Sequence, residues 1–314
     1  MTNKEHFKKF SEHQAEKLGF SMHFNWWNEV VQDSWEVAVL EKGGEIQAIW
    51  PYYLRKKGPW KMIAQAPLTP YAGPFLVYPE GQKTCSKISY EHKQYEALMK
   101  QLPKVAEIDL SFPMRFENGL AFQWNAFEER VKYTYLLNLK SDEAFLWKNL
   151  RENVRRQIKK AEKCLRLEIA FKSEALETAM RSTFEQQHQP YPLAEKYLER
   201  IIHYFEKHEC GKLYLAYEKE QLHSAIAIVY DATTAYYLVG GSMQAHKNSG
   251  AMSLLMWQAI QDAKSRGLEY FNFEGSSIPS IEKYLRGFGG ELQPVRRLIK
   301  KGSKSLEVLK NLKG

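Results

Sequence analysis

The chain has few cysteines and no long hydrophobic run. Its three cysteines, Cys85, Cys164 and Cys210, are odd in number and widely spaced, which fits neither a disulfide framework nor the spacing of zinc ligands. The nine histidines form no HExxH-type pair, so we expect no metal site. Because no run of about eighteen apolar residues exists and the first residues lack an apolar signal core, neither a transmembrane helix nor a secretory signal is expected. These absences favour a globular, cytoplasmic protein.

Low-complexity linkers are also absent, although 314 residues are enough for two domains. Residues 35–49 and 212–226 share a pattern of an alternating strand, a Glu-Lys turn and a returning strand. Helical segments precede both passages. We therefore predict two related α/β halves that join near residues 130–133 and pack closely.

Positive charge is concentrated in two segments of this chain of net charge +8. Residues 148–163 contain seven basic and two acidic residues, and residues 296–314 contain seven basic and one acidic. Such clusters are typical of proteins that bind a phosphate-bearing ligand, a nucleic acid or an anionic lipid headgroup. Solvated helix faces would have the same sequence. We favour that interpretation for the second segment, where a lysine-rich helix at residues 303–309 is expected.

The first basic segment predicts one long helix that starts after Ser141, with Asp142 as its N-cap. Arg151, Arg155 and Lys159 recur every four residues, so they would form one row that could clamp phosphates. An exposed basic face fits the pattern equally well, and both interpretations stay open. A parallel row of apolar residues predicts the buried face of the helix: Leu146, Leu150, Val154 and Ile158.

The passage from residue 235 to residue 277 has the order expected of a ligand site. A strand at 235–239 precedes a loop of small residues and a helix that ends at Arg266 and Gly267, and a buried strand at 270–273 is followed by polar residues. A helix start exposes backbone N–H groups that attract anions, and ligands in open α/β sheets bind at strand ends. We therefore predict a cleft where the two strands diverge, beyond Val239 and Phe273.

The chain resembles the Fem-type group, the peptidoglycan-bridge aminoacyltransferases and their relatives in the acyl-CoA N-acyltransferase (GNAT) superfamily. The resemblance implies an α/β (α+β) fold of two tandem GNAT-like domains, at 1–132 and 133–314, each a mixed, mostly antiparallel sheet flanked by helices. The donor site would lie in the second domain. Four passages, in this order, carry the resemblance: residues 67–74; residues 133–139 with 151–161; residues 236–242; and residues 270–276 with 284–290.

The activity that this resemblance implies is transfer of an acyl or aminoacyl group from acyl-CoA or aminoacyl-tRNA to an amine. Because an amine is protonated at neutral pH, a base is needed before it can attack. Glu274 is the candidate base, and Tyr284 is the candidate proton donor to the leaving group. Glu274 could equally cap a helix or pair with Arg286, and Tyr284 could be a core aromatic residue. The other implied site residues fall in two groups, Tyr237, Val239, Lys247, Gly250 and Ala251 for the donor, and Arg151, Arg155, Lys159 and Arg286 for phosphates.

Three departures from the family pattern limit what the resemblance implies. The second small residue of the GNAT pyrophosphate motif is misplaced in residues 247–252, and Asn272 replaces the usual Asp. Tyr284-Leu285 replaces the Phe-Lys of the bridge-forming enzymes, so acyl-CoA is favoured over aminoacyl-tRNA. The acceptor would be a small-molecule or lipid-linked amine, such as a cell-envelope precursor, reached by peripheral contact with the inner membrane surface. The alternative function is a non-catalytic binder of a phosphate-bearing ligand, either an envelope precursor or a nucleotide.

Overall fold

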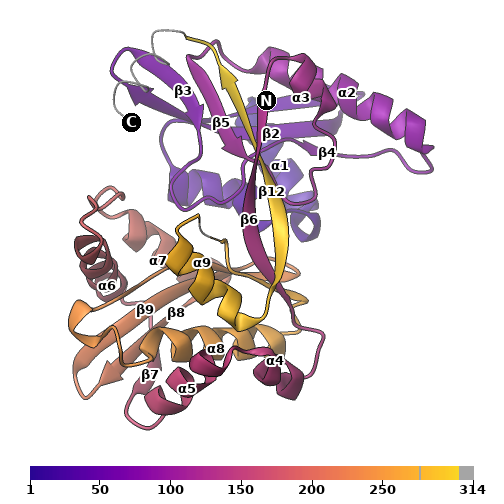
Figure 1. The fold of residues 1–314 in the computed structure, drawn as a ribbon. Helices are drawn as coiled ribbons and strands as arrows, with labels where there is room; N and C mark the ends of the chain where they lie inside the picture. The colour runs from indigo at the N-terminus through magenta and orange to yellow at the C-terminus, as the bar shows by residue number, and fades with distance from the viewer. Residues whose placement is uncertain (276, 304–314) are drawn as a thin grey trace. The chain divides into compact units, whose positions relative to one another are not determined.

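The computed structural model describes residues 1–275 and 277–303. The chain forms two compact units (Figure 1). Unit 1 contains residues 1–132 together with the chain from residue 294, and unit 2 contains residues 133–293. The helix predicted at 303–309 falls almost entirely outside the described residues, and so does Ser276 of the polar corner.

Unit 1 contains a mixed sheet in the order β1-β2-β3-β5-β12, and β4 pairs with β2. The pair β3 and β5 is parallel, whereas β1–β2, β2–β3 and β5–β12 are antiparallel. Its elements before the crossing strands are α1 Asn3–His13, η1 Ala15–Lys17, η2 Phe20–Met22, η3 Trp26–Val31, β1 Trp35–Lys42, β2 Glu45–Lys57, β3 Trp60–Ala64, β4 Phe75–Leu76, α2 Thr84–Gln101, β5 Glu107–Ser111 and α3 Leu120–Trp124.

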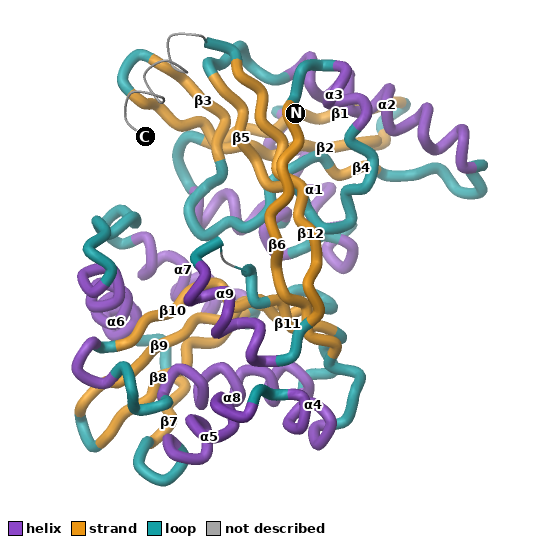
Figure 2. Tube along the Cα trace, viewed as in Figure 1, coloured by secondary structure: helices purple, strands orange, loops and turns teal. Residues whose placement is uncertain are grey.

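In unit 2 the sheet has the strand order β6-β11-β10-β9-β8-β7, and β10 and β11 are the parallel pair. Figure 2 shows α4, α5 and α8 on one face of this sheet and α6 and α7 on the other. The elements are α4 Glu143–Asn149, α5 Glu152–Ala161, β7 Arg166–Ile169, α6 Ser173–Gln186, α7 Tyr197–His208, β8 Gly211–Glu218, β9 Gln221–Tyr230, β10 Thr234–Ser242, η4 Gln244–His246, α8 Ala251–Ser265, β11 Tyr270–Asn272, α9 Pro279–Leu285 and η5 Arg286–Phe288.

The predicted class, α/β with mixed, mostly antiparallel sheets flanked by helices, is confirmed. Both predicted hairpins are present, as β1–β2 and as β8–β9. In each unit the hairpin leads to a third strand, a helix and a strand parallel to the third. The internal repeat that the two hairpins suggested therefore extends through a strand, a helix and a strand.

Two long strands, β6 (Glu128–Asn138) and β12 (Glu291–Lys301), each run from one unit into the other. The sequence placed the last residues in the second half, whereas residues 297–301 of β12 pair with β5 of unit 1. Two arginines of β12 pair with carboxylates that are distant in the sequence: Arg297 forms a two-bond ion pair with Asp109 (2.6 and 2.5 Å), and Arg296 pairs with Glu129. Part of the second basic segment is thus a paired strand and not a solvated helix face.

The single helix predicted after Ser141 is wrong, because the structure has two helices, α4 and α5. Leu150 and Arg151 are extended between them, with ψ of 140° and 142°, and the Arg151 N–H donates to the Gly287 carbonyl (2.8 Å). The predicted N-cap is correct, since Asp142 accepts from the Phe145 N–H (2.6 Å). All four residues of the predicted apolar stripe are buried, at no more than 2% exposure: Leu146, Leu150, Val154 and Ile158.

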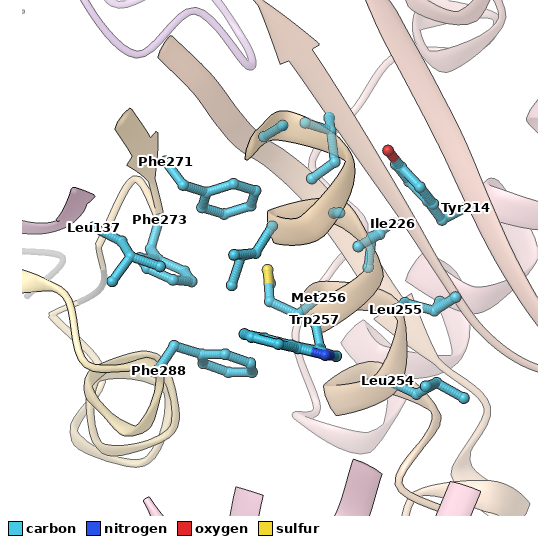
Figure 3. Packing of buried hydrophobic residues seen from close by; sticks show 14 of the residues in the cluster. Leu137, Tyr214, Ile226, Leu254, Leu255, Met256, Trp257, Phe271, Phe273 and Phe288 are labelled. Carbon is cyan, nitrogen blue, oxygen red and sulfur yellow. The ribbon is translucent and has the colours of Figure 1, made fainter. Parts of the chain in front are cut away.

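The core of unit 2 surrounds α8, whose side chains are buried on almost every side. Figure 3 shows the rings of Phe271, Phe273 and Phe288 gathered beside Met256 and Trp257 of this helix. Each fully buried side chain of this size contributes about 1.5–3 kcal/mol through removal of apolar surface from water. This packing holds the start of α8 and the end of β11 in place, and the candidate site lies at these two points.

Candidate functional site

Two neighbouring parallel strands separate at the centre of the candidate site. β10 and β11 form three residue pairs, the last between Tyr236 and Asn272. Beyond that pair β10 continues along β9 as far as Ser242, whereas the chain after β11 stays with β6, since the Phe273 N–H donates to the Tyr135 carbonyl (3.0 Å). β10 therefore has β9 as a ladder partner on one edge only, over its last six described residues.

β10 carries a bulge at the point where its partner leaves. The register against β9 shifts between Tyr237 and Val239, which leaves Leu238 as an extra residue. Such bulges re-aim backbone and side-chain groups. The loop predicted from Gly240 is wrong, because β10 extends to Ser242. A glycine is required at Gly241, where a Cβ atom would lie 2.4 Å from backbone atoms of α6.

The start of α8 lies beside the separated strands and is built on Gly250. This residue has φ of +83°, and a Cβ atom there would lie 2.4 Å from the Gln157 carbonyl oxygen of α5, so glycine is required on both grounds. The first turn of α8 contains no acidic residue and no side-chain cap on Gly250. Its N–H groups have no acceptor within the helix, as at any helix start, and the Ala251 N–H donates to Ser249 Oγ (3.2 Å). The geometry suits a bound anion.

One lysine of the basic segment reaches this loop. Lys160 Nζ donates to the Asn248 carbonyl (3.0 Å), and Lys247 is exposed in the same loop. Sequence reasoning singled out Lys159, whereas the neighbouring Lys160 makes the contact. Gly250 packs against Gln157 and Ala161 of α5, and Lys160 lies three residues after the first and directly before the second. This spacing is the sequence signal that could have identified Lys160.

A small polar cluster sits just inside the start of α8. Ser253, which is 1% exposed, donates from Oγ to Gln157 Oε1 (2.8 Å) and lies 3.5 Å from Tyr284 Oη. Burial raises the pKa of Tyr284 above its ordinary value, and the Ser253 hydroxyl offsets only part of that rise. Burial also raises the pKa of Tyr237 to about 12. Tyr284 is therefore a neutral phenol at physiological pH, which is able to donate a proton.

Glu274 follows β11 at the corner where that strand leaves β10. Its φ is +56°, and its N–H donates to Asn272 Oδ1 (2.9 Å), which also accepts from Thr134 Oγ1 (2.6 Å). Asn272 thus fixes the turn that positions Glu274. Glu274 does not cap α9, whose N-cap is Ile278, and Arg286 pairs with Glu282 (3.0 Å).

The predicted phosphate row makes its contacts away from the loop. Arg151 stands at the N-cap of α5, Arg155 Nη1 donates to the Lys148 carbonyl (2.6 Å), and Lys159 lies 5.9 Å from the Trp147 ring. The structure thus brings together the start of α8, the bulge of β10 and the phenol of α9, but not this row or Arg286. Within the described part of the chain, no basic residue of 148–163 has a carboxylate in ion-pair contact, so the segment's positive charge is not neutralised locally.

A group of three or more His, Cys, Asp or Glu side chains that could hold a metal ion is not found among residues 1–275 and 277–303. In the same residues, no helix combines the length and the apolar character that crossing a membrane requires.

The family model of the acetyltransferase (GNAT) domain matches residues 148–284, which include the separated strands, α8 and Tyr284. The structure called FemX has a TM-score of 0.64 at 14% identity, over 94% of this chain and 96% of that one. The chain has the fold of the Fem-like GNAT relatives. The resemblance inferred from the motifs is thereby confirmed, and the GNAT match supports an acyltransferase.

Two further solved structures share this fold. The C-terminal domain of a putative lysylphosphatidylglycerol synthetase from Agrobacterium fabrum has a TM-score of 0.60 at 11% identity, over 99% of this chain and 96% of that one. L-PGS from Bacillus licheniformis has a TM-score of 0.58 at 9% identity, over 97% and 94%. No curated protein matches the sequence. Identities this low establish the fold alone.

Proposed function

We propose that the protein is an N-acyltransferase that moves an acyl group from acyl-CoA to an amine. The observation that carries the proposal is the separation of β10 and β11 after three residue pairs, beside the start of α8. The edge of β10 that β11 leaves, from Tyr237 to Gly241, can bind an extended chain such as the pantetheine arm through backbone hydrogen bonds, whereas the Ser242 N–H already donates to Thr183 Oγ1 (2.9 Å). The donor's phosphates would then meet the N–H groups of α8 at Gly250 and Ala251, with Lys247 and Lys160 as the nearby cations.

The residues of the corner suit the two proton transfers of this reaction. The amine nitrogen attacks the thioester carbon, so that a C–N bond forms and the C–S bond breaks. Glu274 would take the proton that the amine must lose, and Tyr284 would give a proton to the departing sulfur. The raised pKa of Tyr284 keeps that proton in place at neutral pH. The bulged stretch of β10 from Tyr237 to Val239 would supply N–H groups to the thioester oxygen.

Aminoacyl-tRNA is the alternative donor. One observation favours it: the basic residues of 148–163, including Arg151, Arg155 and Lys159, have no local carboxylate partners within the described chain and would suit a nucleic-acid backbone. The FemX and lysylphosphatidylglycerol synthetase folds are consistent with it. The acceptor would be a small-molecule or lipid-linked amine, such as a cell-envelope precursor. We place the protein in the cytoplasm, in peripheral contact with the inner membrane surface.

The test is to incubate the purified full-length protein with acetyl-CoA, longer acyl-CoAs and charged tRNAs, each with a panel of amines, and to detect products by mass spectrometry. Tyr284→Phe and Glu274→Gln should each lower turnover about 10²- to 10⁴-fold, as expected for lost proton transfer, with donor affinity retained. Tyr90→Phe in unit 1 is the matched control and should leave turnover unchanged. If a phosphate-bearing ligand binds but no donor is turned over, the protein is a non-catalytic binder instead.

A further inference from the structure

Unit 1 contains a cavity of about 650 Å³ that the proposed transfer reaction does not use. This volume lies within the range of roughly 300–1,000 Å³ that is typical of small-molecule sites. All of its lining residues belong to unit 1: Gln14, Lys17, Pro74, Phe75, Leu76, Val77, Tyr78, Lys87, Tyr95, Pro113, Arg115, Phe116 and Glu117.

The lining of this cavity divides into an apolar floor and a charged rim. Phe75, Leu76, Tyr95 and Phe116 are almost fully buried and supply apolar and aromatic surface. The charged members of the lining are exposed at the rim, and they comprise three cations and one carboxylate: Lys17, Lys87, Arg115 and Glu117. A ligand that matches this lining has an apolar body and a negatively charged head.

Two of the cations are held in place. The Arg115 guanidinium lies 4.3 Å from the ring centre of Phe75 and donates from Nη1 to the Lys17 carbonyl (2.7 Å). Lys87 Nζ lies 4.9 Å from the ring centre of Tyr78. Because these side chains are already ordered, a bound anion would gain their attraction at a smaller cost in side-chain entropy.

The wall beside Lys87 is fixed by a buried carboxylate. Glu91, which is 7% exposed, accepts from Tyr78 Oη (2.9 Å) and from Asn118 Nδ2 (2.8 Å), and Lys87 lies 4.0 Å from it. Both carboxylate oxygens therefore have donors inside the protein. Glu91 thus fixes the positions of Tyr78 and Asn118 beside the cavity, and it compensates only part of the positive charge of Lys87.

The internal repeat gives a second reason to expect a ligand at this place, and this reason rests on the proposed function of unit 2. In unit 2 the candidate site is built from the residues that follow two parallel strands and from the helix between them. In unit 1 the corresponding strands are β3 and β5 and the helix is α2. Residues 113–117 of the cavity follow β5, residues 74–78 lie between β3 and α2, and Lys87 and Tyr95 belong to α2. The cavity thus draws on the same kinds of element as the candidate site of unit 2, the chain around the strand ends and the intervening helix, although the ends of β3 and β5 themselves are bridged.

We propose that this cavity is a second ligand site, which binds an amphipathic anion: a carboxylate or phosphate group on an aromatic or branched apolar body. The apolar body would rest on the floor formed by Phe75, Leu76 and Phe116, and the head group would lie at the rim among the three cations. This site is independent of the proposed transfer reaction, and its occupant is not a reactant in it.

The ligand class is tested by titrating the full-length protein in a calorimeter with 4-phenylbutyrate, phenyl phosphate, 4-phenylbutanol, 4-phenylbutylamine and acetate. We expect saturable, one-to-one binding of at least one of the two aromatic anions, and the stronger of them identifies the head group. The neutral alcohol should bind roughly tenfold more weakly, the amine more weakly still, and acetate not measurably, because it has no apolar body. Equal binding of the alcohol and the acid, or no saturable binding of either anion, overturns the proposal.

Variants locate the binding in this cavity. Lys17→Gln and Lys87→Gln should each weaken binding of the anion about two- to fivefold, whereas Glu117→Gln should strengthen it by a similar factor, because these are exposed charges. Lys93→Gln is the matched control on an exposed part of α2 outside the lining. Gln14→Trp fills the cavity without changing its charge and should abolish binding. If Lys93→Gln acts like Lys87→Gln, or if Gln14→Trp has no effect, the binding lies elsewhere and the proposal fails.

Discussion

Each unit contains one parallel strand pair, and the two pairs differ in how the chain continues beyond their last residues. In each, three residue pairs join the strands, β3 with β5 in unit 1 and β10 with β11 in unit 2. In unit 1 the end of the pair is bridged: Gln65 Oε1 accepts from the Ser111 N–H (2.9 Å), and the Ala72 N–H donates to the Ser111 carbonyl (2.9 Å). In unit 2 the chain after β11 remains paired with β6 instead, through the bond from the Phe273 N–H to the Tyr135 carbonyl. Whether a gap forms beyond such a strand pair therefore depends on the hydrogen bonds made by the residues that follow the strands.

The largest effect on this comparison is expected from the glycines that precede the helix of each unit. Gly250 and Gly81 both have positive φ, but a Cβ atom at Gly250 meets the Gln157 carbonyl at 2.4 Å, whereas Gly81 has open space. Gly81→Ala should cost about 1–2 kcal/mol of unfolding free energy through backbone strain alone. Gly250→Ala should cost more and also weaken donor binding. Urea denaturation of both variants measures the difference, and equal losses would contradict the contact with α5.

The bridge in unit 1 can be broken by Gln65→Ala. This change leaves the Ser111 N–H and the Thr69 carbonyl without the partners that the Gln65 side chain supplies at 2.9 and 2.5 Å. We expect a loss of about 1–3 kcal/mol, the usual cost of a buried polar group left without a partner. Gln94→Ala, on α2, is the control and should change stability little. If Gln65→Ala leaves the free energy of unfolding unchanged, the loop closes the end of the strand pair without this side chain.

The cation beside the unit 2 loop gives a smaller effect. Lys160→Gln removes the contact with the Asn248 carbonyl and should weaken acyl-CoA binding about two- to fivefold. Lys159→Gln is the matched neighbour, whose side chain lies over the Trp147 ring, and it should change the affinity less than about twofold. Calorimetric titration with acetyl-CoA compares the two. If Lys159→Gln weakened binding more than Lys160→Gln, the result would support the phosphate-binding row of Arg151, Arg155 and Lys159 that the sequence indicated.

The smallest effect concerns a pair of stacked histidines that is specific to unit 2. The ring centre of His223 lies 3.8 Å from that of His246, the last residue of η4 before α8. Burial, together with nearby His246, lowers the pKa of His223, while the Glu218 carboxylate opposes this shift. The folded protein therefore binds this proton less readily than the unfolded chain. The stability that His223 contributes is complete above its ordinary pKa and falls as the pH drops below it.

Hydrogen exchange checks this expectation. Exchange at residues 243–246 should speed up between pH 7 and pH 5, after correction for the intrinsic rate, while residues 65–73 of unit 1 should not change. His223→Phe keeps the stack but cannot be protonated, so it should remove the pH dependence. An unchanged dependence in that variant would assign the effect to another group.

Local sequence periodicity predicted many of the helices and strands of both units, because the pattern that marks such an element involves residues only a few positions apart. The hairpins, the helix that ends at Gly267 and the apolar stripe from Leu146 to Ile158 are of this kind. The break at Leu150 and Arg151 could not be predicted, because it depends on the Gly287 carbonyl far along the chain. The strand β12 was hidden for the same reason, since its basic side chains are paired with distant carboxylates.

The candidate site was only partly predictable. Its location followed from the order of a strand, a helix and a second strand. The choice between Lys159 and Lys160 depended on which side of α5 meets Gly250, and a helix row in the sequence does not specify the neighbour. The role of Asn272 in the corner depends on Thr134, which belongs to another strand.

The crossing strands have a consequence for how the chain is made. Unit 1 receives its last sheet strand from residues 297–301, whereas every residue of unit 2 precedes Pro294. During translation all of unit 2 is therefore synthesised before the strand that completes the sheet of unit 1. Most of unit 1 is therefore synthesised before unit 2 but completes its sheet after it, and until then the edge of β5 has unpaired backbone groups that could pair with another strand.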